Sequence, residues 1–423
     1  MSALQEQLAY LAASSSFYAE RLRGVHEHVR TEADLPRLPF TTKDELRDGQ
    51  RRNPPFGPHL CAPRERLVRV HVTSGTTGDP VAVGFTKRDH KANSAVGGEA
   101  FRVAGVRSDD VVAHCLNYAL YAGGVADHMA LEASGATVVP VGTGQSRRLL
   151  ELIPKLGITG IFGTLSFPAY LAGRAREAGV DPAGLGLRRI VTAGEPGAGL
   201  AAVRTEIEQA WGATVADTFG MSDVWSTMGG ECGESEGLHL TVLEHAVLEL
   251  VDPDSGDPVT LEDSASGELV WTHLRREASP LLRYRSGDLG RVWTAPCPCG
   301  RGSPRIRIDG RRDDMLRVQA VNVYPQAISA VLADEPGLGR HCVVADGDPV
   351  VPPLHVYAEA PPQVDLARVT DRLHATLRVR FEVTRLNPGS LPVAEQKTRI
   401  VHRTARGDRL PDAVETVRRR AGQ

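Results

Sequence analysis

Residues 71–80 read His-Val-Thr-Ser-Gly-Thr-Thr-Gly-Asp-Pro and lie between an alternating run, 67–72, and an apolar run, 81–85. This pattern predicts a hairpin whose two strands are joined by a Gly/Ser/Thr loop. Glycines let backbone N–H groups approach an anion, and the hydroxyls of Ser74, Thr76 and Thr77 add further donors. We therefore predict a phosphate-binding loop, with an ordinary Ser/Gly-rich turn as the alternative. Asp79 and the strand that follows exclude the P-loop of nucleoside triphosphatases, which needs Gly-Lys-Ser/Thr at a helix start.

The composition describes a globular protein with a sizeable core. The chain has 423 residues, of which 41% are hydrophobic and 24% charged, and a formal net charge of -3. Two or three structural units are expected at this length. The near-neutral charge predicts neither a nucleic-acid nor a membrane partner, and the first residues lack a signal-peptide pattern, so we expect a cytoplasmic protein. Six cysteines are too few for a disulfide scaffold in a chain of this size.

The order of apolar runs predicts an α/β fold with a second, smaller domain. Residues 1–60 look helical, and from 67 to 250 short strands alternate with helices, which indicates a mostly parallel sheet covered on both faces. A strand-rich stretch, 240–310, predicts a small β subdomain. After Gly310 a charged turn leads into a compact α+β domain, so we expect an N-terminal domain over 1–310, a C-terminal domain over 311–423 and a hinge at the turn. The parallel strands are expected over 111–115, 136–141, 158–162 and 189–193.

Three later clusters suit a nucleotide. Gly194-Glu195-Pro196 follows the predicted buried strand that ends at Ala193, where open α/β sheets present ligand-binding residues. Phe219-Gly220-Met221 with Asp223 combines an aromatic ring, a glycine and a carboxylate, which suits a flat base and a hydrated Mg²⁺. Asp288 offers a carboxylate in a predicted tight turn, matched to ribose hydroxyls. Ordinary structural turns are the alternative for each cluster.

Taken together, these stretches resemble the adenylate-forming superfamily and, within it, the phenylacetate-CoA ligase family. The resemblance spans nearly the whole chain and implies that ATP and a carboxylic acid give an acyl-adenylate and pyrophosphate. Rotation of the C-terminal domain and attack by a nucleophile, usually the CoA thiol, would follow. Further matching motifs are Leu38-Pro39-Phe40-Thr41-Thr42-Lys43, Gly230-Glu231-Cys232, Tyr284-Arg285-Ser286-Gly287-Asp288, Cys297-Pro298-Cys299-Gly300-Arg301 and Gly310-Arg311-Arg312-Asp313-Asp314-Met315.

The resemblance also implies roles for single residues. Asp223 would hold Mg²⁺, Asp288 and Arg311 the ribose, and Asp313 would be the hinge residue between the two half-reactions. The β- and γ-phosphates would be bound by Thr73, Ser74, Gly75, Thr76, Thr77 and Gly78, and the adenine would be flanked by Gly194, Glu195 and Pro196, with Phe219 and Gly220 nearby.

Lys397 is a candidate catalytic residue on two grounds. The chain has lysines only at 43, 87, 91, 155 and 397, so a lysine in an arginine-rich tail suggests a role for a compact ammonium. Such a charge can neutralise the transition state as the acid attacks the α-phosphate. A surface lysine is the alternative, but the resemblance places Lys397 in the loop that delivers the adenylation lysine. Gln396 stands where the family commonly has glycine.

Two cysteine pairs predict a structural zinc site. Cys297 and Cys299 form Cys-x-Cys, and Cys232 with His239 gives Cys-x₆-His, so the four side chains can close a tetrahedral site with no position left for water. Unligated buried cysteines are the alternative. The other cysteines, Cys61, Cys115 and Cys342, have no such partner in the sequence.

The resemblance implies that the acyl pocket lies near residues 117–124 and two strand ends. Tyr118 and Tyr121 would contact an aromatic or alicyclic acid, or would pack in the core instead. The other residues expected there are Gly123, Gly124, Ala193 and Met221.

Departures from the family pattern leave the acceptor open. Ala320 stands where CoA ligases commonly have a glycine that lines the pantetheine passage, Asp79 stands where lysine is frequent, and Asp223 replaces the usual Glu. The leading interpretation is an acid-CoA ligase, and the second passes the acyl group to an amine or to a carrier-protein thiol. The third is a non-catalytic nucleotide-binding or zinc-stabilised protein. A homodimer stays open.

Overall fold

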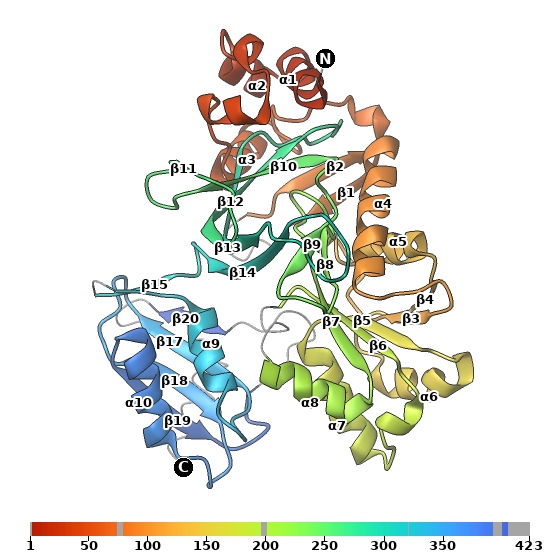
Figure 1. Ribbon diagram of the computed structural model, residues 1–423, viewed down its shortest axis with the longest axis vertical. Helices are drawn as coiled ribbons and strands as arrows, with labels where there is room; N and C mark the ends of the chain where they lie inside the picture. The colour runs from red at the N-terminus through yellow and green to blue at the C-terminus, as the bar shows by residue number, and fades with distance from the viewer. Residues whose placement is uncertain (1, 74–78, 196–200, 320, 392–399, 405–423) are drawn as a thin grey trace. The chain divides into compact units, whose positions relative to one another are not determined.

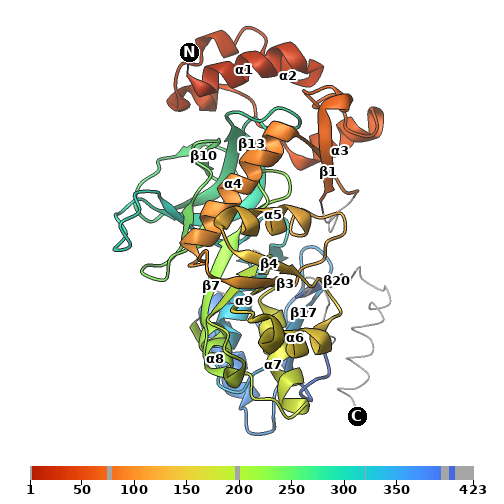
Figure 2. The ribbon, with the colours of Figure 1, turned by 90° about the vertical axis from the view of Figure 1, so that its right-hand side faces the viewer.

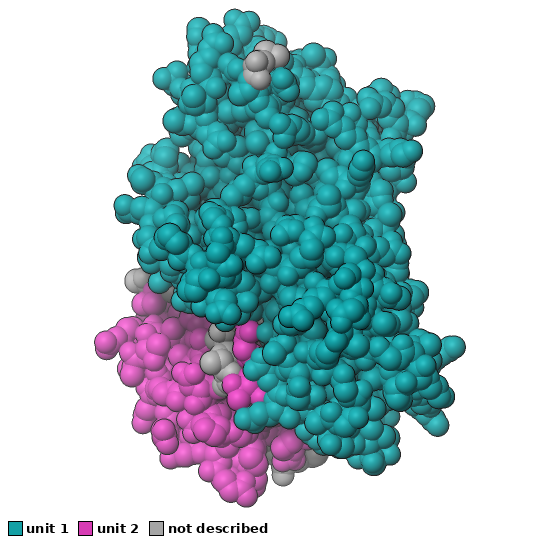
Figure 3. All heavy atoms as spheres, turned by 45° about the vertical axis from the view of Figure 1, so that its right-hand side comes forward, with its two compact units in different colours: residues 1–194, 207–308 teal, residues 195–206, 309–423 magenta. Residues whose placement is uncertain are grey.

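The computed structural model describes residues 2–73, 79–195, 201–319, 321–391 and 400–404 (Figure 1). The chain divides into two compact units, coloured in Figure 3: residues 1–194 with 207–308, and residues 195–206 with 309–423. The division at 308/309 lies close to the expected boundary at 310/311, whereas the grouping of 195–206 with the second unit was not expected. A mobile C-terminal domain stays a prediction.

The N-terminal segment is helical, as predicted. It forms α1 (Ala3–Ser14), α2 (Ser16–Leu22) and α3 (Lys43–Arg52), and the Ser2, Ser15 and Thr42 side chains each accept a hydrogen bond at a helix start. Leu8, Leu11 and Tyr18 are buried in one cluster with Val247 and Leu282 of the strand-rich region. The segment is therefore anchored by apolar burial on the strand-rich part of the first unit.

The predicted hairpin is confirmed. Strands β1 (Leu67–Val72) and β2 (Ala82–Thr86) pair antiparallel, with His71 opposite Val83. The Thr73 N–H donates to the Val81 carbonyl at 3.0 Å, and the Val81 N–H donates to Thr73 Oγ1 at 3.0 Å. The two ends of the glycine-rich loop are thus closed on one another.

Five parallel strands form one half of the main sheet, in the order β4-β3-β5-β6-β7. In Figure 2, α5 and α6 lie on opposite sides of β3 and β4, so the predicted parallel sheet covered on both faces is confirmed. The strands are β3 (Val111–His114), β4 (Thr137–Pro140), β5 (Gly160–Gly163), β6 (Arg189–Ala193) and β7 (Thr214–Phe219), and the helices are α4 (Lys87–Val103), α5 (Val125–Ser134), α6 (Ser146–Leu156), α7 (Ser166–Glu177) and α8 (Ala201–Trp211).

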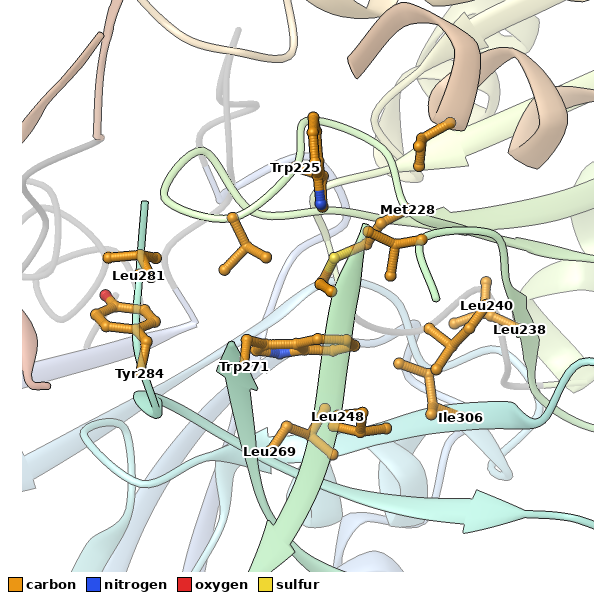
Figure 4. Close-up of a cluster of buried hydrophobic side chains, with 14 of the residues drawn as sticks. Trp225, Met228, Leu238, Leu240, Leu248, Leu269, Trp271, Leu281, Tyr284 and Ile306 are labelled. Carbon is orange, nitrogen blue, oxygen red and sulfur yellow. The ribbon is translucent and has the colours of Figure 1, made fainter. Parts of the chain in front are cut away.

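The predicted strand-rich stretch extends the same sheet. The twelve-stranded order is β11-β10-β12-β13-β14-β9-β8-β7-β6-β5-β3-β4, and the direction changes to antiparallel between β7 and β8. Trp225, Met228 and Trp271 are buried in the core of this half (Figure 4). Its strands are β8 (Gly229–Glu231), β9 (Leu238–Leu240), β10 (Ala246–Val251), β11 (Pro258–Val259), β12 (Ala265–His273), β13 (Tyr284–Trp293) and β14 (Arg305–Arg311).

The second unit is α+β, as predicted. Its four-stranded sheet has the order β19-β18-β17-β20 and packs on two helices through Ile328, Leu354 and Leu373. The elements are β15 (Leu316–Val318), β16 (Val321–Val323), α9 (Pro325–Ala333), β17 (His341–Asp346), β18 (Leu354–Glu359), α10 (Leu366–Leu377), β19 (Phe381–Leu386) and β20 (Val401–Thr404). Within the described ranges, none of the helices combines the length and apolar composition that crossing a bilayer requires.

Candidate active site

A tight loop that begins at Phe219, the last residue of β7, carries Gly220, Met221 and Asp223. A Cβ added to Gly220 would lie 1.7 Å from the carbonyl oxygen of Ser226, so only glycine fits where the loop folds back. The Met221 N–H donates to the Trp225 carbonyl at 2.7 Å, and Phe219 accepts from the Met228 N–H at 2.8 Å. The backbone thus closes the loop at the strand end where the sheet changes direction.

Three buried polar side chains hold this loop from outside. Asn93 on α4 donates to Ser226 Oγ at 2.7 Å and accepts from the Ser226 N–H at 3.1 Å. Asp127 on α5 accepts from the Thr227 hydroxyl at 2.8 Å. His273 on β12 lies 3.2 Å from the Val224 carbonyl through Nε2 and accepts from the Leu281 N–H at 2.9 Å. Buried, satisfied hydrogen bonds of this kind fix one loop conformation.

Burial changes the pKa values of two of these groups. Desolvation raises the pKa of Asp127 to about 7, against the opposing hydrogen bonds from Thr227 and Ser226. Desolvation, together with the positive charge of Arg276, lowers the pKa of His273 to about 3. At neutral pH His273 is therefore uncharged, which its acceptor role at Nδ1 requires.

The Asp223 carboxylate is buried and held on one side only. Its Oδ2 accepts from the Lys43 ammonium at 3.3 Å and from the Tyr284 hydroxyl at 3.1 Å. Its Oδ1 is buried without a donor among the described residues. In Figure 4 the Tyr284 hydroxyl is directed away from Trp271 and the core. An oriented carboxylate with one open oxygen suits a hard cation such as Mg²⁺.

The predicted phosphate loop is described only at its base. Thr73 is buried and its side-chain oxygen accepts the Val81 N–H, so its acceptor capacity closes the hairpin. Gly194 follows β6 with a positive φ of 81°, and Glu195 follows it. Ser74, Gly75, Thr76, Thr77, Gly78 and Pro196 lie outside the described residues.

Asp288 is not in a tight turn, which corrects the prediction. It lies inside β13, where the pairing with β12 shifts register between Glu268 and Val270. Gly287 has a φ of 76°, and the Asp288 N–H donates to Ser286 Oγ at 3.0 Å. A β-bulge of this kind re-aims a side chain within a continuous strand. The sequence missed it because the glycine that marks a turn also marks a bulge.

Tyr118 is engaged by neighbouring side chains. Its hydroxyl lies 2.9 Å from His128 Nδ1, while His128 Nε2 lies 3.2 Å from Glu132 on α5. The Tyr118 ring packs on His114, whose Nε2 donates to the Gly123 carbonyl at 3.1 Å. The Tyr118 hydroxyl and part of its ring thus contact other residues of the protein, and a contact of Tyr118 with the acid stays a prediction.

The remaining residues predicted for the acyl pocket lie at loop and strand ends. A Cβ on Gly124 would lie 2.6 Å from the Asn117 carbonyl oxygen, so glycine permits the close turn before α5. Tyr121, Ala193 and Met221 are half-buried. Desolvation and the nearby His128 lower the pKa of His114 to about 4, so this buried imidazole beside Tyr118 is neutral at pH 7.

In the second unit, Arg311 and Asp313 pair with each other. Arg311 Nε and Nη2 lie 2.8 Å and 3.0 Å from the two Asp313 oxygens, in a two-pronged ion pair. The roles predicted for them, ribose contact and hinge, stay predictions. Lys397 and Ala320 lie outside the described residues.

The four predicted zinc ligands lie together in the first unit. The ligand atoms of Cys232, His239, Cys297 and Cys299 are all within 4.8 Å of one another. His239 Nδ1 lies 3.1 Å from the Ser303 carbonyl, which turns Nε2 toward the sulfurs. Although desolvation opposes it, hydrogen bonding with Ser235, Cys299 and His239 lowers the pKa of Cys297 to about 6.

Sequence reasoning missed the partners of Asp223 and the side chains that hold its loop. Lys43 had a signal, because it is one of five lysines in a chain whose positive charge is mostly arginine. The residues Asn93, Asp127, His273 and Tyr284 have no local pattern that marks them, since each acts across a long sequence separation.

Comparisons with known proteins show the family to which the chain belongs. Residues 6–273 match the family described as AMP-binding enzyme. The phenylacetate-coenzyme A ligase of Thermus thermophilus is 38% identical over 352 residues, 81% of this chain and 77% of that protein. The phenylacetate-coenzyme A ligase of Aromatoleum evansii is 33% identical over 84% of this chain and 78% of that protein.

A solved structure is similar over both units. The crystal structure of 2-hydroxyisobutyryl-CoA ligase, in the postadenylation state with R3-HIB-AMP, has a TM-score of 0.87 and 28% identity. The similarity covers 95% of this chain and 88% of that one. The chain therefore belongs to the AMP-binding enzymes and, among them, to the phenylacetate-CoA ligase family.

Proposed function

We propose that this protein activates an aromatic or alicyclic carboxylic acid with ATP and transfers the acyl group to the thiol of CoA. In the first step a carboxylate oxygen attacks the α-phosphorus, and the bond to the bridging oxygen of pyrophosphate breaks. In the second step the CoA sulfur attacks the acyl carbonyl, AMP leaves, and the thiol proton passes to solvent. Membership of the phenylacetate-CoA ligase family supports both steps.

The observation that carries the proposal is the arrangement of Asp223. A buried carboxylate with Oδ2 held by Lys43 and Tyr284, and Oδ1 without a donor in the described part of the chain, fits a Mg²⁺ ligand. The magnesium would neutralise phosphate charge as pyrophosphate leaves. The loop that bears Asp223 also carries Phe219, Gly220 and Met221, which would lie against the nucleotide and the acid.

The other site roles extend this proposal. Asp288 and Arg311 would bind the ribose, Gly194, Glu195 and Pro196 the adenine, and Lys397 would neutralise the transition state at the α-phosphate. Asp313 would act as the hinge, for which its pairing with Arg311 gives a contact that can be broken. Thr73 and the loop 74–78 would bind the terminal phosphates.

The acid is proposed to be aromatic or alicyclic because of the Tyr118 segment. The Tyr118 hydroxyl already contacts His128, so the partly exposed Tyr118 offers a ring face more than a free hydrogen bond. Tyr121, Gly123 and Gly124 would complete the surface. An apolar ring stacked there needs no polar partner.

A zinc ion held by Cys232, His239, Cys297 and Cys299 is proposed as a structural element. Three sulfurs and one imidazole nitrogen within 4.8 Å match the ligands that zinc prefers. The cluster joins β8 and β9 to residues 297–303, so binding would hold the middle of the sheet together.

Three further expectations concern the acceptor, the cellular location and the oligomeric state. An amine or a carrier-protein thiol as acceptor depends on Ala320, which lies outside the described residues. A cytoplasmic location is also proposed, because none of the six cysteines forms a disulfide, as is usual in reducing compartments. A homodimer stays a prediction.

The test is acid-dependent pyrophosphate release across aryl and alicyclic acids, with product mass analysis after CoA is added. Wild type should give an acyl-CoA, and Lys397→Ala should lower pyrophosphate release by about 100-fold or more. Lys155→Ala, which removes an exposed lysine of α6, is the matched control. Acyl-adenylate without thioester would move the assignment to another acceptor, and no pyrophosphate from any acid would overturn the proposal.

A further inference from the structure

We propose that Lys43 is a nucleotide-binding residue whose ammonium bridges the Asp223 carboxylate and a phosphate oxygen of ATP. This inference rests on the proposed function, because it requires ATP at the Asp223 loop. It adds to that site a lysine that neither the phosphate loop nor the C-terminal tail supplies.

The position of Lys43 is fixed by backbone contacts on either side of Tyr284. The Thr41 N–H donates to the Arg283 carbonyl, and the Arg285 N–H donates to the Thr41 carbonyl, both at 3.0 Å. Lys43 begins α3 two residues later, after the Thr42 N-cap. The same backbone pairing therefore brings the Lys43 and Tyr284 side chains to one oxygen of Asp223.

Helix α3 also runs beside the strand that follows the glycine-rich loop. Arg47 Nε donates to the Asp79 carbonyl at 3.0 Å, and Gln50 makes two hydrogen bonds with the Ala82 backbone, at 2.7 Å and 3.0 Å. Lys43, Arg47 and Gln50 are spaced i, i+4 and i+7, so they share one helix face. Lys43 thus lies one turn beyond the residue that holds Asp79.

The charges around Lys43 leave its ammonium available. The two acidic residues that follow it on α3 have cations of their own, since Asp44 pairs with Arg47 at 2.9 Å and Glu45 pairs with Arg21. Within the described residues, Asp223 is the ion-pair partner of Lys43, whose side chain is 29% exposed. An ammonium has three N–H donors, so donors remain for a second anion.

A purely structural ion pair is the competing explanation. It accounts for the 3.3 Å contact, but it gives no reason for the buried Asp223 Oδ1 to lack a donor in the described part of the chain. A bound Mg²⁺–ATP would use both features, with the cation at Oδ1 and a phosphate oxygen at the lysine. A compact ammonium suits a phosphate oxygen as a point charge.

The test measures ATP binding by calorimetry, once with EDTA and once with Mg²⁺, on the full chain. Lys43→Met keeps the apolar stem and removes the charge, and we expect it to weaken ATP binding by about tenfold or more in both conditions. Asp223→Asn should weaken binding only when Mg²⁺ is present. That contrast separates a phosphate contact from a metal contact.

Lys87→Met is the matched control. Lys87 also begins a helix after a threonine N-cap in a capping box, but it is exposed, so ATP binding should stay within twofold of wild type. A Lys43→Met protein that melts earlier yet binds ATP like wild type would overturn the inference alone. A wild type that binds no ATP would overturn the proposed function and this inference with it.

Discussion

The Asp223 loop and the Cys232/His239/Cys297/Cys299 cluster are both polar centres in the first unit, but they are completed differently. In the cluster, the ligand atoms of three cysteines and one histidine lie within 4.8 Å of one another, so the protein supplies all four ligands that a tetrahedrally coordinated zinc ion needs. At Asp223 one oxygen is held by two donors and the other has none among the described residues. The cluster is thus suited to a permanent ion, and the loop to a ligand that arrives and leaves.

The largest effect is expected from breaking the cluster. Cys297→Ala should release the metal and lower the Tm by about 10 °C, because a structural zinc site contributes its binding energy to folding. Zinc content by plasma emission and a thermal melt check this. Cys342→Ala, a buried cysteine outside the cluster, should keep the zinc. A purified wild type without metal, with the same Tm as Cys297→Ala, would contradict a structural zinc site.

A smaller but selective effect is expected from distorting the loop. Gly220→Ala places a methyl group 1.7 Å from the Ser226 carbonyl oxygen, so the loop must shift, at a cost of about 3 kcal/mol. ATP–pyrophosphate exchange should fall at least about tenfold while zinc stays bound. Gly173→Ala on α7, where an added Cβ meets nothing within 4 Å, is the control and should behave as wild type. If the rate of ATP–pyrophosphate exchange is unchanged in Gly220→Ala, the conformation of this loop is not required for adenylation.

Acid should lower the free energy of unfolding of the first unit, because three of its buried histidines are neutral in the folded state. Burial lowers the pKa of His71 and His114 to about 4 and of His273 to about 3. As the pH falls, these histidines are therefore protonated in the unfolded chain at a higher pH than in the folded one. Each of these histidines contributes its full share to the free energy of unfolding above about pH 6.5. As the pH falls below this value, the free energy of unfolding decreases by about 1.4 kcal/mol per pH unit for each histidine. Urea unfolding at pH 7.5, 6.0 and 5.0 measures this. In His273→Gln the loss should be smaller, and an unchanged wild type at pH 5.0 would refute the assignment.

The smallest effect is expected at Asp127, with the opposite sign. Its raised pKa of about 7 means that the folded state keeps a proton that the unfolded state loses, so stability declines as pH rises from about 4 to 7. Asp127→Asn keeps a partner for Thr227 without this ionisation. Its Tm should match wild type near pH 4 and exceed it by about 4 °C at pH 8. A difference that does not depend on pH would show that Asp127 does not titrate in this range.

Local patterns in the sequence predicted local structure well. The hairpin around the glycine-rich loop and the strand that ends at Ala193 follow from apolar alternation and from buried runs, which depend on neighbouring residues alone. The spacing of Cys232/His239 and Cys297/Cys299 also predicted that these four side chains come together, because each pair is short and only the contact between the two pairs depends on the fold. Asp288 was assigned to the wrong element, since a glycine marks a bulge and a turn alike.

The support of Asp223 could not be predicted in the same way. Lys43 lies 180 positions from Asp223, and His273 lies 49 from the carbonyl that it holds, so each contact depends on how the sheet and helices pack. A single asparagine, aspartate or histidine in an apolar stretch has no periodic signature. Such residues become visible only when burial and hydrogen-bond partners are known.

The most direct test of the difference between the two centres is ATP–pyrophosphate exchange on one sample before EDTA, in EDTA, and after Mg²⁺ alone is restored. We expect exchange to stop in EDTA and to return with Mg²⁺, while about one zinc per chain stays bound throughout. Exchange that persists without Mg²⁺, or that returns only when zinc is added, would contradict the assignment of the exchangeable cation to Asp223 and of the permanent one to the cysteine cluster.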